Sequence, residues 1–240
     1  MRYRAVLLDV GETLIGPHEP YHIVYARVFH GLGLELPVER FAAGLSHTLE
    51  QLGRQVPPGS DRFGFFPGGE DEFWRRFATT SVEHAAGRAV EPELISRAAA
   101  ELRDFFATPD AWRVYPDTVP ALEALRESGV RLGVVSNWDS RLPHVLRILD
   151  LADYFEAVGV SHLEGTEKPS PTMFHRVRQH LGTSPEETLH VGDVPELDLE
   201  GARRAGIDGM LVDRHGRLDG HHRAITDLEE LPRIALRGTA

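Results

Sequence analysis

Residues 5–16 read AVLLDVGETLIG, a short apolar run that ends in a single aspartate, Asp9. The run before Asp9 has the length and composition of a buried strand, so the carboxylate stands at the C-terminal end of that strand. Gly11, the second residue after Asp9, has no side chain at all. A buried strand that delivers one carboxylate to its end indicates a functional group. Gly11 leaves no second side chain beside that carboxylate.

The composition is that of a soluble globular protein. The chain has 240 residues, 41% hydrophobic and 26% charged, enough for one large domain or for a core with a smaller domain. The net charge of -11 argues against a general nucleic-acid-binding protein, which needs clustered lysine and arginine. The absence of cysteine excludes disulfides, thiolate catalysis and zinc sites with cysteine ligands.

The first apolar stretch is too short for a signal peptide, and Asp9 interrupts it. No apolar run is long enough to span a membrane. We therefore expect a cytoplasmic protein with no membrane partner.

Four helices are predicted in the segment that follows the first strand, because apolar residues recur there at helical spacing. A loop rich in proline, glycine and phenylalanine separates the second helix from the third, and no part of the segment from about 20 to 108 reads as a strand. The predicted helices are 21–33, 37–55, 70–87 and 91–107.

After Pro109 the pattern changes to short apolar strands that alternate with helices, which predicts a parallel sheet with both faces covered. The predicted strands are 4–10, 130–137, 155–161, 188–193 and 207–213, and the predicted helices are 118–129, 140–151, 170–182, 196–206 and 225–236. The fold class is therefore α/β. We expect a core domain of residues 1–16 and 109–240, with a helical domain of residues 17–108 inserted after the first strand.

Polar side chains follow several of the predicted strands. Asp9, Ser136 with Asn137, and Asp193 stand at strand ends, and Lys168 lies in a loop before a helix. Because ligands of open parallel sheets bind beyond the carboxyl ends of the strands, we expect these groups to converge. Two carboxylates suit a hard divalent cation such as Mg²⁺, whereas a hydroxyl, a helix start and a lysine suit a phosphoryl group.

Lys168 is the only lysine among 26 basic residues. A coding bias toward arginine explains this composition. A need for a compact ammonium on a flexible stem, which a guanidinium cannot replace, explains it equally well. The sequence leaves both explanations open.

The whole chain resembles the haloacid dehalogenase-like hydrolase superfamily. The resemblance is carried, in order and spacing, by DVGETL, VVSN, EKPSP and VGDVPELDLEGARRAG. It implies a Rossmann-like parallel sheet with helices on both faces, and the inserted helices are similar to the small helical cap of subfamily I. DVGETL together with SNWDSRL resembles the branch typified by rhythmically expressed gene 2 proteins, most of them unassigned phosphatase-like proteins.

The resemblance implies a role for each residue at the phosphate. Asp9 would be the nucleophile that forms an aspartyl-phosphate. Ser136, with Asn137 beside it, would hydrogen-bond the phosphoryl oxygens. Lys168 would neutralise charge on the nucleophile and the phosphate.

The resemblance also implies a Mg²⁺ site. Asp193 would hold the ion together with Asp9 and the backbone carbonyl of Gly11, and Asp198 would support it from the same acidic loop. The cation would lower the repulsion between the nucleophile and the phosphoryl group. For Asp198, a carboxylate favoured by the dipole at a helix start is almost as good an interpretation.

Gly11 departs from the family pattern, in which this position is the aspartate that acts as general acid and base. Such proton transfer is typically worth 10² to 10⁴-fold, or about 3 to 5 kcal/mol of barrier. Three outcomes stay open. Glu12 replaces the missing acid, or the enzyme is slow or suited to good leaving groups such as acyl phosphates, or the protein binds a phosphorylated ligand without useful turnover.

The function indicated first is a Mg²⁺-dependent phosphohydrolase acting on a small phosphorylated molecule. The second is a non-catalytic phospholigand-binding or interaction protein, and the third a 2-haloacid dehalogenase. Dehalogenases of the superfamily also lack the second aspartate, but they need no Mg²⁺, so Asp193 and Asp198 favour the phosphohydrolase.

Asp139 and a group of aromatic residues are expected to have structural rather than catalytic roles. Asp139 is most simply a helix cap or first-turn residue. The aromatic residues Phe63, Phe65, Phe66 and Trp74 are expected in the core of the helical domain rather than in a substrate platform.

Overall fold

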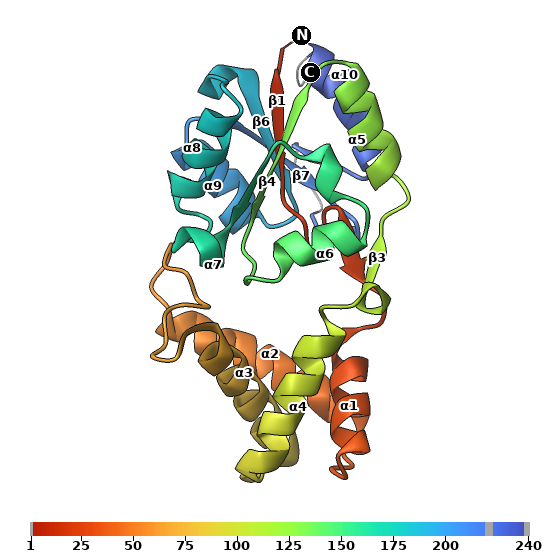
Figure 1. Cartoon of the computed structure of the whole chain (residues 1–240), viewed down its shortest axis with the longest axis vertical. Coiled ribbons are helices and arrows are strands. Elements are labelled where there is room, and N and C mark those ends of the chain that lie inside the picture. Colours follow the sequence, from red (N-terminus) through yellow and green to blue (C-terminus); the bar gives the residue numbers. More distant parts are fainter. Residues whose placement is uncertain (1, 219–222, 238–240) are drawn as a thin grey trace. The chain divides into compact units, whose positions relative to one another are not determined.

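The computed structural model describes residues 2–218 and 223–237 (Figure 1). The chain forms two compact units, one of Met1–Gly16 with Val114–Ala240 and one of Pro17–Arg113. The segment 109–113, which the sequence places in the core domain, belongs to the second unit. β3 (Trp112–Val114) pairs with β2 (Ile15–Pro17) in a two-stranded sheet. The chain passes from the first unit to the second within β2 and returns within β3.

A six-stranded parallel sheet forms the centre of the first unit, in the order β5-β4-β1-β6-β7-β8. Leu8, the last residue of β1, lies beside Val134 on one side and Val191 on the other. The C-terminal end of β1 is therefore flanked by the ends of β4 and β6. The strands are β1 (Ala5–Leu8), β4 (Arg131–Ser136), β5 (Ala157–Val160), β6 (Thr188–Gly192), β7 (Asp208–Val212) and β8 (Ala224–Ile225).

Helices cover both faces of this sheet, as predicted: Figure 1 shows α8 and α9 on one face and α5 and α10 on the other. Leu7 of β1 packs with Phe174 and Val177 of α8 in a buried apolar cluster. The helices of this unit are α5 (Thr118–Glu127), α6 (Leu142–Ile148), α7 (Ser161–Glu164), α8 (Pro171–His180), α9 (Glu200–Arg204) and α10 (Leu231–Arg237).

The second unit is built from the four predicted helices, each within two residues of its predicted bounds. They are α1 (Tyr21–Gly31), α2 (Val38–Gln55), α3 (Gly69–Ala86) and α4 (Pro92–Phe105). Phe63 and Phe66 are buried in the core of this unit and Trp74 packs against it, as expected. Phe65 differs, because 43% of its surface is exposed. No strand lies between residues 20 and 108, all of which the structure describes.

Two predicted helices near the C-terminus are shorter than expected. Pro195–Leu199 forms a π-helical turn, so α9 begins only at Glu200. The predicted helix 225–236 is wrong at its start, because Ile225 ends β8; Leu228–Glu230 forms a 3-10 turn and α10 begins at Leu231. Proline is tolerated only in the first turn of a helix, and Pro232 therefore fixes the start of α10. None of the helices in the described part of the chain is long and apolar enough to cross a membrane.

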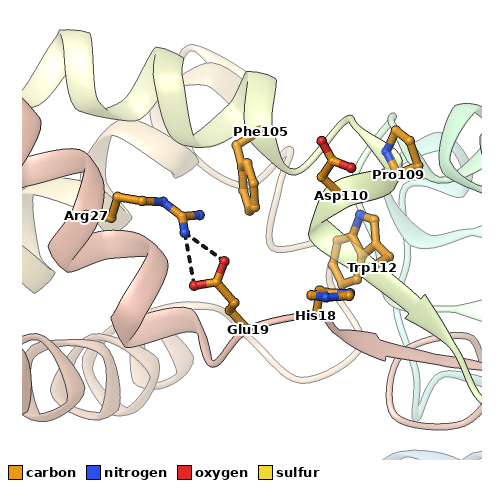
Figure 2. A pocket seen from close by; sticks show the side chains of 7 residues that line it. All are labelled: His18, Glu19, Arg27, Phe105, Pro109, Asp110 and Trp112. Atoms are coloured by element: carbon orange, nitrogen blue, oxygen red, sulfur yellow. Dashed lines mark hydrogen bonds and ion pairs between the residues drawn. The ribbon is translucent and has the colours of Figure 1, made fainter.

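The helical unit contains a pocket of about 610 Å³ (Figure 2). Its arginine is already paired, because Arg27 Nη1 lies 2.7 and 3.0 Å from the two carboxylate oxygens of Glu19, and the Arg27 guanidinium lies 5.1 Å from the centroid of the Phe105 ring. The Arg27 guanidinium is therefore already neutralised by a carboxylate inside the pocket. It is lined by His18, Glu19, Arg27, Phe105, Pro109, Asp110 and Trp112.

Candidate active site

Asp9 and Lys168 meet in the α/β unit, where the C-terminal end of β1 reaches the loop before α8. The backbone N–H of Asp9 donates to the carbonyl of Val191 at 2.9 Å, which fixes the end of β1 against β6. Lys168 Nζ lies 2.9 Å from Asp9 Oδ1 and 2.7 Å from Asp198 Oδ1, and Lys168 is only 1% exposed. Burial alone would lower the pKa of Lys168, but the charges of Asp198 and Asp9 raise it above its ordinary value.

The backbone of Lys168 is held by Asn137, the residue after β4. Lys168 N donates to Asn137 Oδ1 at 2.7 Å, and Asn137 Nδ2 donates to the carbonyl of Lys168 at 3.1 Å. The sequence assigns Asn137 to the phosphate; in the structure its amide oxygen and nitrogen serve the lysine loop. Ser170 is the N-cap residue of α8, since its hydroxyl accepts from Thr172 N.

Asp198 is a buried acceptor with several donors. Its Oδ1 accepts from Lys168 Nζ at 2.7 Å and from His190 Nε2 at 2.8 Å, and its Oδ2 accepts from Val194 N at 2.9 Å. Burial opposes ionisation, but the charge of Lys168 and the hydrogen bond from His190 hold the pKa of Asp198 well below its usual range. Asp198 lies in the first turn of the π-helical segment Pro195–Leu199, where its Oδ2 accepts from the N-cap residue Val194, while its Oδ1 accepts from Lys168. Both interpretations of Asp198, as a helix-start carboxylate and as a partner of the site, therefore fit its contacts.

Gly192, the last residue of β6, makes room for this carboxylate. A Cβ on Gly192 would lie 2.1 Å from Asp198 Cγ, a distance that no side chain can tolerate. Because the Asp198 oxygens are fixed by their donors, the carboxylate could not move aside without breaking those hydrogen bonds. The glycine next to Asp193 in the sequence VGD is therefore required by packing.

Three carboxylates gather at this end of the sheet. Asp9, Asp193 and Asp198 each offer one oxygen, and these oxygens lie within 4.8 Å of one another. Burial, followed by repulsion from Asp9 and Asp198, raises the pKa of Asp193 to about 7. Carboxylate oxygens are the ligands that hard divalent cations prefer, and a cation would offset this repulsion. The donor set therefore fits an ion such as Mg²⁺.

Gly11 and Glu12 do not supply a carboxylate to this group. The backbone of Gly11 is outside the left-handed region, and a Cβ there would lie 3.4 Å from Trp138 Cζ3, so the indole occupies the adjoining space. Glu12 does adopt a left-handed conformation, with φ 55°. Its Oε2 accepts from Tyr115 Oη at 2.8 Å and from His215 Nε2 at 2.9 Å. Glu12 is thus held by the segments after β3 and β7.

Ser136 lies where the sequence predicts, as the last residue of β4, and it is 1% exposed. Asp139 is fully buried, and its Oδ1 accepts from Arg141 N at 3.0 Å, a turn contact before α6 consistent with the predicted role. None of the predicted site residues lines the pocket of the helical unit.

Sequence reasoning missed several residues around the site. His190 left a signal, because it interrupts an otherwise apolar strand. Trp138 follows Asn137 directly, but nothing in the sequence shows that its ring reaches Gly11. Tyr115 and His215 left no signal, since they lie about a hundred or more positions from Glu12 along the chain.

The parallel α/β sheet brings a carboxylate, a buried lysine and an acidic loop to the carboxyl ends of its central strands, which is where open α/β sheets bind their ligands. The family model for haloacid dehalogenase-like hydrolases matches residues 3–206, and the chain belongs to this family. It is therefore an enzyme, a hydrolase, and the predicted family and fold are confirmed.

Relatives and solved structures include phosphatases. The chain is 28% identical to haloacid dehalogenase-like hydrolase domain-containing protein 3 of Bos taurus, over 88% of this chain and 82% of the relative. It is 30% identical to phosphoserine phosphatase of Thermus thermophilus (88% and 89%) and 26% identical to the rhythmically expressed gene 2 protein of Drosophila melanogaster (88% and 85%). A phosphatase of the family from Thermococcus onnurineus has a similar structure, with 27% identity, a TM-score of 0.69 and 98% of both chains covered.

Proposed function

We propose that this chain is a Mg²⁺-dependent phosphohydrolase that acts on a small phosphorylated substrate through an aspartyl-phosphate at Asp9. The observation that carries the proposal is the buried ammonium of Lys168, 2.9 Å from Asp9 Oδ1, beside a group of carboxylates. A nucleophilic carboxylate needs a cation to approach an anionic phosphoryl group, and this arrangement supplies one. The phosphoserine phosphatase relative is named for a small phosphorylated substrate, which supports the same class of substrate here.

In the proposed reaction a carboxylate oxygen of Asp9 attacks phosphorus, and the bond from phosphorus to the leaving oxygen breaks with its electron pair on that oxygen. Lys168 offsets the negative charge that the nucleophile and the phosphoryl oxygens bring together, and the Ser136 hydroxyl donates to a phosphoryl oxygen. Water then attacks the phosphorus of the aspartyl-phosphate, which releases inorganic phosphate and restores Asp9.

Asp9, Asp193 and the backbone carbonyl of Gly11 would hold Mg²⁺, with Asp198 supporting the site through Lys168 and the acidic loop. When bound, the ion would supply positive charge that offsets the repulsion between an anionic nucleophile and an anionic phosphoryl group. Both oxygens of Asp198 already accept hydrogen bonds from protein groups, which is why we assign it the supporting role.

The missing acid at position 11 shapes the substrate preference that we propose. Glu12 follows Gly11, but its carboxylate accepts from Tyr115 and His215 and lies outside the group formed by Asp9, Asp193 and Asp198. A leaving group that departs as a stable anion needs little help from an enzyme acid. Aryl and acyl phosphates are therefore expected to be better substrates than alkyl phosphates.

The helical unit is proposed to act as a cap domain that selects the substrate. Two observations support this role: Pro17–Arg113 is inserted directly after the turn that follows Asp9, and the unit has an aromatic core of its own. A separately folded insertion next to a catalytic strand is the usual means by which an enzyme controls access to its site.

The proposal is tested by a screen of phosphorylated metabolites, including aryl and acyl phosphates, with Mg²⁺ and with a chelator, run beside a 2-haloacid. Phosphate release that needs Mg²⁺ is the expected result. Halide release without metal would instead establish a dehalogenase. Saturable binding of a phosphorylated compound with no product would show a ligand-binding protein.

A further inference from the structure

His190 is a buried titratable residue that the proposed reaction does not use. It lies in β6, is 0% exposed, and packs edge-on against the ring of Phe174, with 4.8 Å between the ring centroids. Its Nε2 lies 2.8 Å from Asp198 Oδ1, and its Nδ1 is buried without a hydrogen-bond partner among the described residues. A polar ring in the interior of a strand requires a reason, because burial of unpaired polar atoms is costly.

The hydrogen bond between His190 and Asp198 has one direction. An ionised carboxylate only accepts hydrogen bonds. His190 Nε2 therefore carries the proton and donates the hydrogen bond to Asp198 Oδ1. A proton on Nδ1 would be a buried donor with no acceptor, which favours the tautomer protonated at Nε2. The ring is thereby fixed as a donor aimed at Asp198.

The hydrogen bond from His190 helps to fix the Asp198 carboxylate, which in turn holds the ammonium of Lys168. Val194 N holds Asp198 Oδ2, and His190 holds Oδ1, so the two donors fix the rotation of the carboxylate from both sides. Lys168 Nζ is 2.7 Å from the same Oδ1 and 2.9 Å from Asp9 Oδ1. A continuous buried path of polar contacts therefore runs from His190 through Asp198 and Lys168 to Asp9.

We infer that His190 is a positioning residue for the reaction: by fixing Asp198 Oδ1 it keeps the ammonium of Lys168 against Asp9. The inference rests on the proposed function only in assigning chemistry to Asp9. Loss of the Nε2 donor frees the Asp198 carboxylate to rotate, and the ammonium follows the carboxylate. Displacement of a catalytic charge by about 1 Å costs up to about 10²-fold in rate.

The single lysine of the chain makes this inference directly measurable. Protein labelled with [¹³Cε]lysine gives one side-chain NMR signal, which reports Lys168 without any turnover. The variant His190→Gln places an amide N–H near the position of Nε2, whereas His190→Asn is also an amide but is too short to reach Asp198. His180→Asn, at the exposed end of α8, is the matched control.

We expect His190→Gln to keep the Lys168 signal of the wild type and kcat for an aryl phosphate within about threefold. His190→Asn should shift the signal and lower kcat by about tenfold or more, with KM within about twofold, in a protein that thermal unfolding shows to be folded. The control should change neither quantity.

The inference is overturned if folded His190→Asn keeps the wild-type Lys168 signal and kcat, or if His190→Gln and His190→Asn lose both equally. If the wild type hydrolyses no phosphate ester, the proposed function fails. The NMR comparison then still decides whether His190 positions Lys168.

Discussion

The surroundings of Lys168 explain why this position is the single lysine of the chain. Its ammonium is 1% exposed and lies 2.9 Å from Asp9 and 2.7 Å from Asp198, a space between two carboxylates that suits a compact charge. An arginine carries a planar, larger head and presents its donors in a fixed fork. The lysine is therefore better explained by the site than by coding bias.

The substitution Lys168→Arg is accordingly expected to be harmful although it conserves charge. The guanidinium would displace Asp9, Asp198 or both, and we expect kcat/KM for an aryl phosphate to fall at least about tenfold, or about 1.4 kcal/mol of transition-state stabilisation. Steady-state kinetics of the purified variant measure this. Unchanged kcat/KM would leave coding bias as the explanation of the single lysine.

Gly11→Asp should restore the missing acid and raise hydrolysis of alkyl phosphates more than that of aryl phosphates, because only the poorer leaving group needs a proton. The backbone of Gly11 is not left-handed, so an aspartate meets no conformational penalty there, but its Cβ would touch the indole of Trp138 at 3.4 Å. Rates over a series of leaving groups measure the effect.

The companion variant Glu12→Gln tests the alternative acid. If it abolishes turnover of alkyl phosphates while a folded Gly11→Asp changes nothing, Glu12 is the acid and base, and Gly11 is no catalytic deficit. We expect instead a modest effect, since the Glu12 carboxylate is held by Tyr115 and His215.

The sequence places the principal residues of the site better than it assigns their contacts. Strand ends and motif order are enough to bring Asp9 and Lys168 into one region. They do not show that the side-chain amide of Asn137 hydrogen-bonds the backbone of Lys168, or that the Glu12 carboxylate hydrogen-bonds His215. Such hydrogen bonds join segments far apart in the chain, and no local pattern encodes them.

At the scale of elements, length decides what can be predicted. The four helices of the second unit are long enough to show their periodicity, and each lies within two residues of its prediction. The strands β2, β3 and β8, of two or three residues, are too short for any alternation and were not predicted. The π-helical turn at Pro195–Leu199 resembles an α-helix in its pattern, so its different geometry is visible only in the structure.

The close contact between β6 and the π-helical turn leads to a stability prediction. Gly192→Ala places a Cβ 2.1 Å from Asp198 Cγ, so the carboxylate must leave its donors. We expect the free energy of unfolding to fall by at least about 2 kcal/mol, measured by denaturant unfolding. Gly53→Ala is the control, because a Cβ at this position in the last turn of α2 meets nothing within 4 Å and should not lower the free energy of unfolding. Equal effects of the two variants would contradict the packing role of Gly192.

For the whole molecule, the closeness of Asp193 to Asp9 and Asp198 makes the free energy of unfolding depend on pH. Asp193 has a pKa of about 7 in the fold against an ordinary value of 3.8, so the folded chain holds this proton more tightly than the unfolded chain does. In metal-free buffer this group therefore lowers stability progressively as pH rises from about 4 to about 7. Asp193→Asn mimics the protonated form and should remove that loss.

Thermal unfolding of both proteins across this pH range, with chelator, measures the effect. The unfolding temperature of Asp193→Asn relative to wild type should increase with pH up to about 7 and then level off. Added Mg²⁺ at pH above 7 should stabilise the wild type more than the variant, because the ion offsets the repulsion and binds the folded state. A difference that does not depend on pH or on Mg²⁺ would argue against a cation site at Asp193.

The role of Asp9 is tested most directly by the initial rate of hydrolysis of an activated aryl phosphate by wild type and by Asp9→Asn, each with Mg²⁺ and with a chelator. We expect turnover only for the wild type and only with Mg²⁺, because the amide of asparagine cannot act as the nucleophile. Undiminished hydrolysis by Asp9→Asn, or by the wild type in chelator, would contradict a Mg²⁺-dependent reaction through an aspartyl-phosphate at Asp9.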